Sequence, residues 1–170
     1  MPTVKSGPAG LAASIGFGAA RLVLGGLWLH EGLFKYAAHF GRADIGLLVQ
    51  GAQSNTRVPG YFQVFAASIL SHCETVAGFA VPLLEVSLGV ALIAGILTLP
   101  AAAASALTLM MYWSSDQLIA QYPIMGALSV VILLWPQQAA RLSVSTLLIG
   151  SARLHPRLRT MASGPLRRWL

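Results

Sequence analysis

The chain alternates between long apolar stretches and shorter polar connections. Four stretches have the apolar content of membrane-spanning helices, namely Leu11–Phe34, Glu74–Leu97, Ala101–Ser115 and Leu118–Trp135. A helix rises about 1.5 Å per residue, so about 20 apolar residues cross the hydrocarbon of a bilayer. The first two stretches reach this length, and the last two are shorter. The pattern predicts an all-α integral membrane four-helix bundle over residues 1–150.

Two connecting segments mix apolar and polar residues in a way that is typical of helices lying on a membrane surface. They run from Lys35 to His72 and from Gln137 to Ile149. We expect short interfacial helices in both, in the connection between spans one and two and after span four. A helix that begins at Pro59 either stops before the second span or continues into it. A tight turn at Thr98–Pro100 is expected to join spans two and three.

Composition supports the same class. Of the 170 residues, 9% are charged and 56% are apolar, whereas a soluble domain carries about 25% charged residues. Six of the eleven Lys and Arg residues lie at or after Arg141, so residues 151–170 form a basic tail. A basic tail next to apolar spans is typical of the cytoplasmic side of a membrane with its anionic lipid headgroups. Nucleic acid is therefore not an expected partner, and membrane lipid is.

The distribution of positive residues also predicts the orientation. With an even number of spans, Lys5 lies on the same side as the six late arginines, and only Lys35, Arg42 and Arg57 lie on the other side. Positive residues concentrate on the cytoplasmic side. Both termini are therefore expected in the cytoplasm. The first stretch is too long for a signal peptide and contains Arg21, so we expect it to remain as a span.

Arg21 and Glu85 are charged residues within the first two predicted spans. A charge at the bilayer centre costs at least about 2.5–3.5 kcal/mol, so such a residue normally faces a partner or a wet cavity. Counted from the expected inner ends of the two antiparallel spans, their depths agree within about one turn. We therefore predict an Arg21–Glu85 ion pair. It either fixes the helix register or forms the polar floor of a ligand pocket.

A second group of polar and aromatic residues is expected at the outer ends of the spans. It consists of His30, Glu31, Lys35, His72, Glu74, Asp116 and Gln117, with Tyr112 and Trp113 one turn deeper. Acid–base side chains above an apolar cleft are what a quinone site needs. This predicts His30, Glu31 and Asp116 as catalytic candidates, with Arg21, Lys35, Glu85, Tyr112 and Trp113 around the quinone. Charged and aromatic residues are also routine at a membrane interface.

Several other chemistries are not predicted. None of the four histidines lies mid-span, which disfavours haem. His30 and Glu31 are adjacent and do not share a helix face, so no metal site is predicted. Cys73 is the single cysteine, which excludes an internal disulfide. A solute transporter is disfavoured because no repeated pair of broken helices is evident.

Two strings of residues resemble the DoxX/DoxD family of small bacterial membrane proteins. They are Arg21-Leu-Val-Leu-Gly-Gly-Leu-Trp-Leu-His-Glu-Gly-Leu-Phe-Lys35 and Pro82-Leu-Leu-Glu85-Val-Ser-Leu-Gly89-Val-Ala-Leu-Ile-Ala-Gly95. The insert with Asn55, Pro59 and Tyr61 looks more like the DoxD branch. The resemblance spans about residues 11–140 and matches Arg21, Lys35 and Glu85 to family motif positions.

The resemblance implies four helices in the bacterial cytoplasmic (inner) membrane. For the DoxD branch it implies the membrane subunit of thiosulfate:quinone oxidoreductase. The leading hypothesis is thus a subunit that passes electrons from a sulfur or thiol donor to quinone, with the donor-oxidising partner on a separate redox chain. The alternative is a non-catalytic scaffold or assembly subunit of a redox complex. A pocket open laterally to lipid between spans one and two would favour the first hypothesis.

Overall fold

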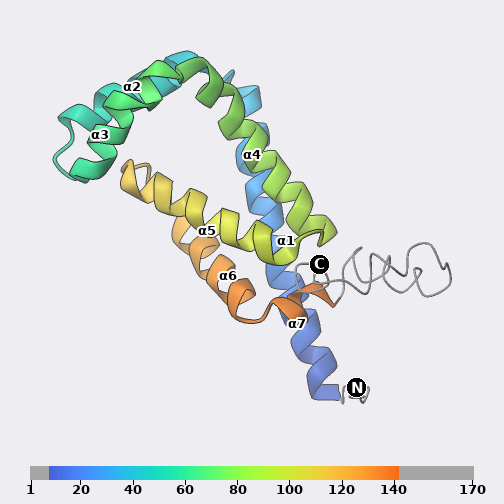
Figure 1. Cartoon of the computed structure of the whole chain (residues 1–170). Helices are drawn as coiled ribbons and strands as arrows, with labels where there is room; N and C mark the ends of the chain where they lie inside the picture. The colour runs from blue at the N-terminus through green and yellow to red at the C-terminus, as the bar shows by residue number, and fades with distance from the viewer. Residues whose placement is uncertain (1–7, 142–170) are drawn as a thin grey trace, which may run out of the picture.

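A computed structural model describes residues 8–141, and all regular structure within them is helical (Figure 1). Seven α-helices and one short 3₁₀ helix follow each other in this part of the chain. Their bounds are α1 Pro8–Ala37, α2 Arg42–Ser54, α3 Gly60–Ser68, η1 Leu70–His72, α4 Glu74–Ala94, α5 Thr98–Ser114, α6 Tyr122–Leu134 and α7 Pro136–Ala140. The predicted all-α class is confirmed.

The two longest helices, α1 and α4, pack against each other in antiparallel directions through glycines. A Cβ atom on Gly32 would lie 2.8 Å from the backbone nitrogen of Val86. A Cβ atom on Gly89 would lie 2.7 Å from the backbone nitrogen of Leu29. Small residues let helix backbones approach closely where lipid supplies no hydrophobic driving force. These contacts fix which residues of α1 and α4 face each other.

The same two helices are long and apolar enough to cross a membrane, by length and composition alone. They are Gly10–Ala37 within α1, with 28 residues, and α4, with 21 residues. Helix α5 has 17 residues and α6 has 13, or about 26 Å and 20 Å of rise, against about 30 Å of hydrocarbon. The membrane location is supported by the two long helices, and the four-span bundle stays a prediction.

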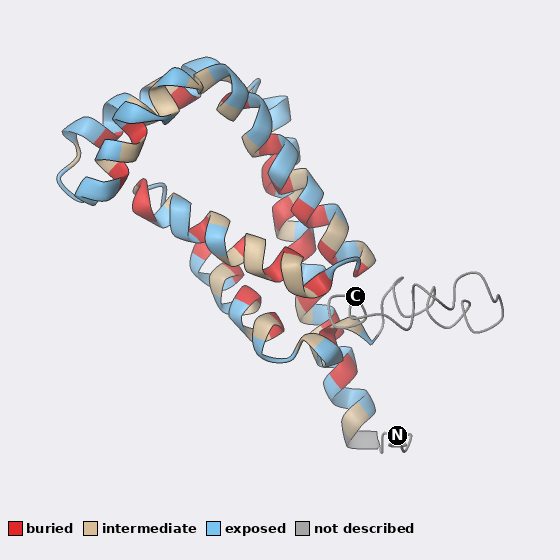
Figure 2. Ribbon diagram, in the orientation of Figure 1, coloured by how far each residue is buried: buried red, intermediate tan, exposed pale blue. Residues whose placement is uncertain are grey.

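Both long helices have many exposed positions (Figure 2), and several of these positions carry large apolar side chains. On α4, Val76 is 67% exposed and Phe79 is 65% exposed, and on α1 Phe34 is 62% exposed. Soluble monomers rarely expose large contiguous apolar patches. Lipid chains are the environment that such a surface fits.

Two helix boundaries differ from the prediction. The expected turn Thr98–Pro100 is instead the first turn of α5, because proline fits where a helix has no backbone donor to satisfy. The true turn contains Gly95 and Leu97, both with left-handed φ, of 69° and 52°. Helix α6 starts at Tyr122 rather than Leu118, with Pro123 as its second residue. This position suits proline, whose fixed φ is helical.

The connection between α1 and α4 folds into a helical hairpin of α2 and α3. Its own small core contains Ala52, Val58, Phe62 and Ala66. Helix α3 ends at Ser68, and η1 separates it from α4, so the helix that begins near Pro59 does not continue into the second span. Two short helices are therefore present where interfacial helices were predicted. The predicted helix 137–149 lies mostly outside the described residues, as does the tail 151–170.

Candidate functional site

Polar side chains from α1, α4, α5 and α6 meet at one buried position. Its members are Glu31, Lys35, Glu85, Tyr112, Gln121 and Tyr122, which we call the carboxylate cluster. Glu85 is 0% exposed and Glu31 is 7% exposed. Glu31 and Lys35 share a face of α1 because they lie four residues apart. The helix packing thus brings two carboxylates, an ammonium group and two phenols into an apolar interior.

Glu85 is held by two donors. Lys35 Nζ donates to Glu85 Oε1 at 2.5 Å, and the Tyr112 hydroxyl donates to the same oxygen at 2.5 Å. The Lys35 ammonium also lies 5.3 Å from the centre of the Tyr112 ring, within cation–π range. Lys35 Nζ is 3.7 Å from Glu31 Oε2. The lysine therefore lies between the two carboxylates, with its close contact to Glu85.

Glu31 accepts hydrogen bonds from two residues at the start of α6. Gln121 Nε2 donates to Glu31 Oε1, and the Tyr122 hydroxyl donates to Oε2 at 3.4 Å. His30 Nδ1 lies 3.7 Å from Glu31 Oε1, and the histidine side chain is 69% exposed. His30 thus places an exposed imidazole directly beside a buried carboxylate.

The cluster contains more acid than base. With Glu31, Glu85 and Lys35 ionised, its formal charge is −1. Glu85 Oε2 is buried and has no hydrogen-bond partner within residues 8–141. A buried charge or polar atom without a partner is costly. The arrangement is therefore suited to taking up a proton, which would neutralise the excess negative charge.

A buried chain of hydrogen bonds lies next to the cluster. Trp28 Nε1 donates to Ser105 Oγ at 2.7 Å, and Ser105 Oγ is 2.7 Å from Ser129 Oγ. These bonds tie α1 to α5 and α6. The Trp28 and Tyr112 rings lie 6.3 Å apart, and the Tyr112 and Tyr122 rings lie 5.3 Å apart. Both phenols are consequently held in position by packed aromatic neighbours.

The predicted Arg21–Glu85 pair is wrong. Arg21 Nη1 donates instead to the carbonyl oxygens of Leu92 at 2.7 Å and Ile93 at 3.3 Å. These belong to the last turn of α4, where unpaired carbonyls favour a cation. Leu92 is about 10 Å from Glu85 along α4 at 1.5 Å per residue. The glycine contacts shift the register so that Lys35, rather than Arg21, reaches Glu85.

The other predicted site residues divide into two groups. Glu31, Lys35, Glu85 and Tyr112 are brought together, and His30 lies at the edge of their cluster. Asp116 lies apart from it and binds Asn55 and Arg57 of the connection that follows α2. Trp113 is 61% exposed, on the surface of α5. His72 and Glu74 contact Ser71 and Arg42 rather than the cluster.

Gln121 and Tyr122 were not among the predicted site residues. They lie at the start of α6 next to Pro123, and this proline was the available signal. It marks a helix start, and a helix start between two spans lies at the level of the other span ends. Tyr122 is 8% exposed there.

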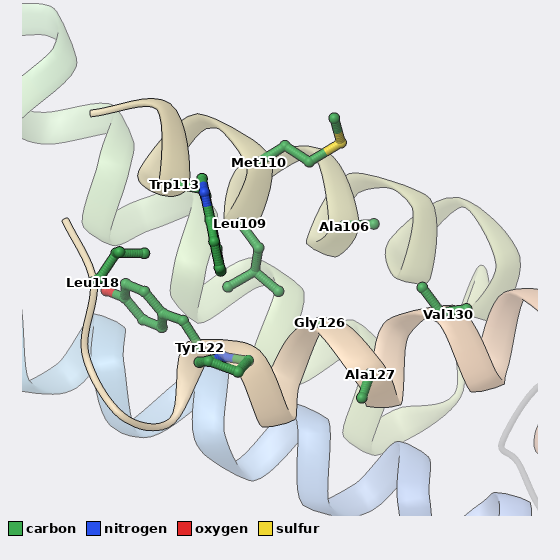
Figure 3. A pocket seen from close by; sticks show the side chains of 10 residues that line it. Ala106, Leu109, Met110, Trp113, Leu118, Tyr122, Gly126, Ala127 and Val130 are labelled. Carbon is green, nitrogen blue, oxygen red and sulfur yellow. The ribbon is translucent and has the colours of Figure 1, made fainter. Parts of the chain in front are cut away.

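An apolar groove of about 440 Å³ runs between α5 and α6 on the surface of the bundle (Figure 3), and not between the first two predicted spans, where a lipid-open pocket would have favoured the quinone hypothesis. Its walls include Leu109, Met110 and Trp113 from α5, Leu118 from the connection, and Tyr122, Gly126, Ala127 and Val130 from α6. Figure 3 shows Trp113 and Tyr122 near the same end of this groove. Tyr122 therefore belongs both to the groove and, through its hydroxyl, to the carboxylate cluster.

Comparison with known proteins adds no relative. No protein-family model, no curated protein and no solved structure matches the chain. The likeness to the DoxX/DoxD family rests on the motif strings alone.

Proposed function

We propose that the chain is a four-span membrane subunit of a quinone-linked oxidoreductase of the DoxD type. In this proposal it lies in the bacterial inner membrane with both termini cytoplasmic. A separate redox chain oxidises a sulfur or thiol donor and delivers the electrons. Bound quinone is the two-electron acceptor. The residues of this chain bind it and transfer protons to it.

The position of Tyr122 is the observation that carries the proposal. Its ring lines the apolar groove, and its hydroxyl donates to Glu31 at 3.4 Å. A quinone needs an apolar cleft for its tail and polar groups at the ring carbonyls. The groove offers the first to a molecule arriving from lipid. The cluster offers the second, and Tyr122 connects the groove to it.

The polar end fits a group that accepts both hydrogen bonds and protons. Tyr122 and Gln121 donate hydrogen bonds to Glu31 in this structure. A quinone carbonyl oxygen that accepts a hydrogen bond from Tyr122 or Gln121 takes that donor over from Glu31. Glu31 and Glu85 are the groups that hold a proton close to the ring, and Lys35 balances whichever carboxylate is ionised. His30 is the exposed group through which a proton reaches Glu31.

Quinone binding is the direct test. The full chain, purified in detergent, should retain quinone on lipid extraction or bind a short-tailed soluble quinone with a micromolar Kd, about −8 kcal/mol. Tyr122→Phe removes the hydroxyl and keeps the groove, so it should weaken binding about tenfold. Tyr36→Phe is the matched control, because Tyr36 is an exposed tyrosine on α1 and its change should leave the Kd unchanged.

Two results would count against the proposal. The first is a well-folded preparation, with its partner chain present, that neither retains nor binds quinone. The second is equal binding by the Tyr122→Phe variant and the parent. The scaffold hypothesis would then be preferred, and the chains that co-purify would identify what the subunit stabilises.

A further inference from the structure

The α2–α3 hairpin is anchored firmly at its base. A Cβ atom on Gly78 of α4 would lie 2.5 Å from the carbonyl carbon of Gly41, so the backbones there are in tight contact. Arg42 Nε also donates to Glu74 Oε2 at 3.1 Å. The start of α2 is thus packed directly on the first half of α4.

The tip of the hairpin is held by a different kind of contact. Asp116 Oδ2 accepts from Asn55 Nδ2 at 2.7 Å and from Arg57 Nη2 at 2.6 Å. The Tyr61 hydroxyl lies 2.5 Å from Ser114 Oγ. Figure 1 shows the hairpin reaching from the end of α1 and α4 toward the end of α5, where these bonds form. The hairpin's apolar residues pack in its own core. These contacts between its tip and the end of α5 are polar.

A cavity of about 350 Å³ lies between the hairpin and the end of α5. It is lined by one side of α2, by Phe40 and by the turn 115–117. The Lys35 ammonium lies 6.0 Å from the centre of the Phe40 ring. The cavity is therefore one aromatic ring away from the Lys35–Glu85 pair.

We propose that the hairpin is a strap over this cavity, latched at its tip by Asp116, and that its opening admits water and polar solutes toward Lys35. Each tip bond can be exchanged for a bond to water, so each contributes little net free energy. The ion pair with Arg57 is weakened further because the arginine side chain is 77% exposed. The close backbone packing at the base of the hairpin cannot be replaced by contacts with water in this way. Segments held by exposed polar bonds open before packed ones.

Thiol labelling in detergent tests the strap without relying on quinone. In a Cys73→Ser background, Ser115→Cys is the reporter, because Ser115 lines the cavity and is 7% exposed. A neutral, water-soluble maleimide is the probe. Arg57→Gln and Tyr61→Phe loosen the latch from the hairpin side and leave the sequence of the reporter's own segment, 114–117, unchanged. Arg42→Gln, at the base, is the control variant, and Ser54→Cys, exposed at the end of α2, is the control reporter.

Each latch variant should label Ser115→Cys about two- to tenfold faster than the parent, and the double variant should multiply the two effects. Arg42→Gln should change the rate less than either latch variant, and Ser54→Cys should label at one rate throughout. The strap is refuted if the double variant labels Ser115→Cys at the parental rate. It is equally refuted if Arg42→Gln accelerates labelling as much as the double variant does. Neither result bears on whether the groove binds quinone.

Discussion

Replacing Lys35 by Met is the most informative perturbation of the cluster. It removes the ammonium group that lies between Glu31 and Glu85 and leaves two carboxylates in an apolar interior. Glu85 would keep the Tyr112 hydroxyl, and Glu31 would keep Gln121 and Tyr122. Replacing Glu85 by Gln has a milder consequence, because Lys35 still has Glu31 at 3.7 Å and the formal charge of the cluster changes from −1 to zero.

The magnitudes follow from this asymmetry. Removing one partner of a buried pair costs about 3–5 kcal/mol, so Lys35→Met should destabilise the chain by about that amount. Since about 1 kcal/mol shifts Tm by about 2–4 °C at this size, the expected decrease is about 6–20 °C. Adding Glu85→Gln to Lys35→Met removes one uncompensated carboxylate. The double variant should therefore be more stable than Lys35→Met alone, by about 2 kcal/mol.

Thermal unfolding of the four proteins of this cycle in one detergent is the assay. The control cycle uses Arg42→Gln and Glu74→Gln, because this pair lies at the surface, with Arg42 74% exposed. Its coupling should be about 0–1 kcal/mol. Additive effects of Lys35→Met and Glu85→Gln, or a coupling no larger than that of the surface pair, would refute the assignment of Lys35 as the charge partner of Glu85.

Three further predictions concern packing and topology. Gly89→Ala should destabilise the chain by about 1–3 kcal/mol in thermal unfolding, because its Cβ would meet the Leu29 backbone. Gly16→Ala, where a Cβ meets nothing within 4 Å, should be neutral or stabilising, and equal losses at both positions would contradict the glycine-set register. Trp28→Phe should cost about 1–3 kcal/mol by the same assay, because it removes the indole donor to Ser105 and leaves a smaller ring in the core; an unchanged Tm would refute this. Reporter fusions should be external near Ser54 and cytoplasmic after Arg153. A periplasmic C-terminus together with an external Ser54 would exclude an even number of spans.

Much of the local structure is determined by the sequence alone. The apolar stretches are long enough to form helices wherever they lie, and Gly and Pro mark where they stop. The start of α4 at Glu74 matched the expected start of the second span. Where the prediction failed, at Pro100, proline occupies the first turn of a helix rather than a turn between helices. A proline has both uses, so its presence alone does not tell them apart.

The partners of the charged residues were decided by tertiary structure. The sequence indicates that Arg21 and Glu85 each need a partner, because an isolated charge in the membrane is costly. It does not indicate which one, because a shift of α1 along α4 by a few turns exchanges the facing residues. The close contacts at Gly32 and Gly89 select one register, in which Glu85 meets Lys35 and Arg21 meets the end of α4. Tyr122 joins the cluster only because α6 packs beside α1, a contact between residues 91 positions apart that no local pattern specifies.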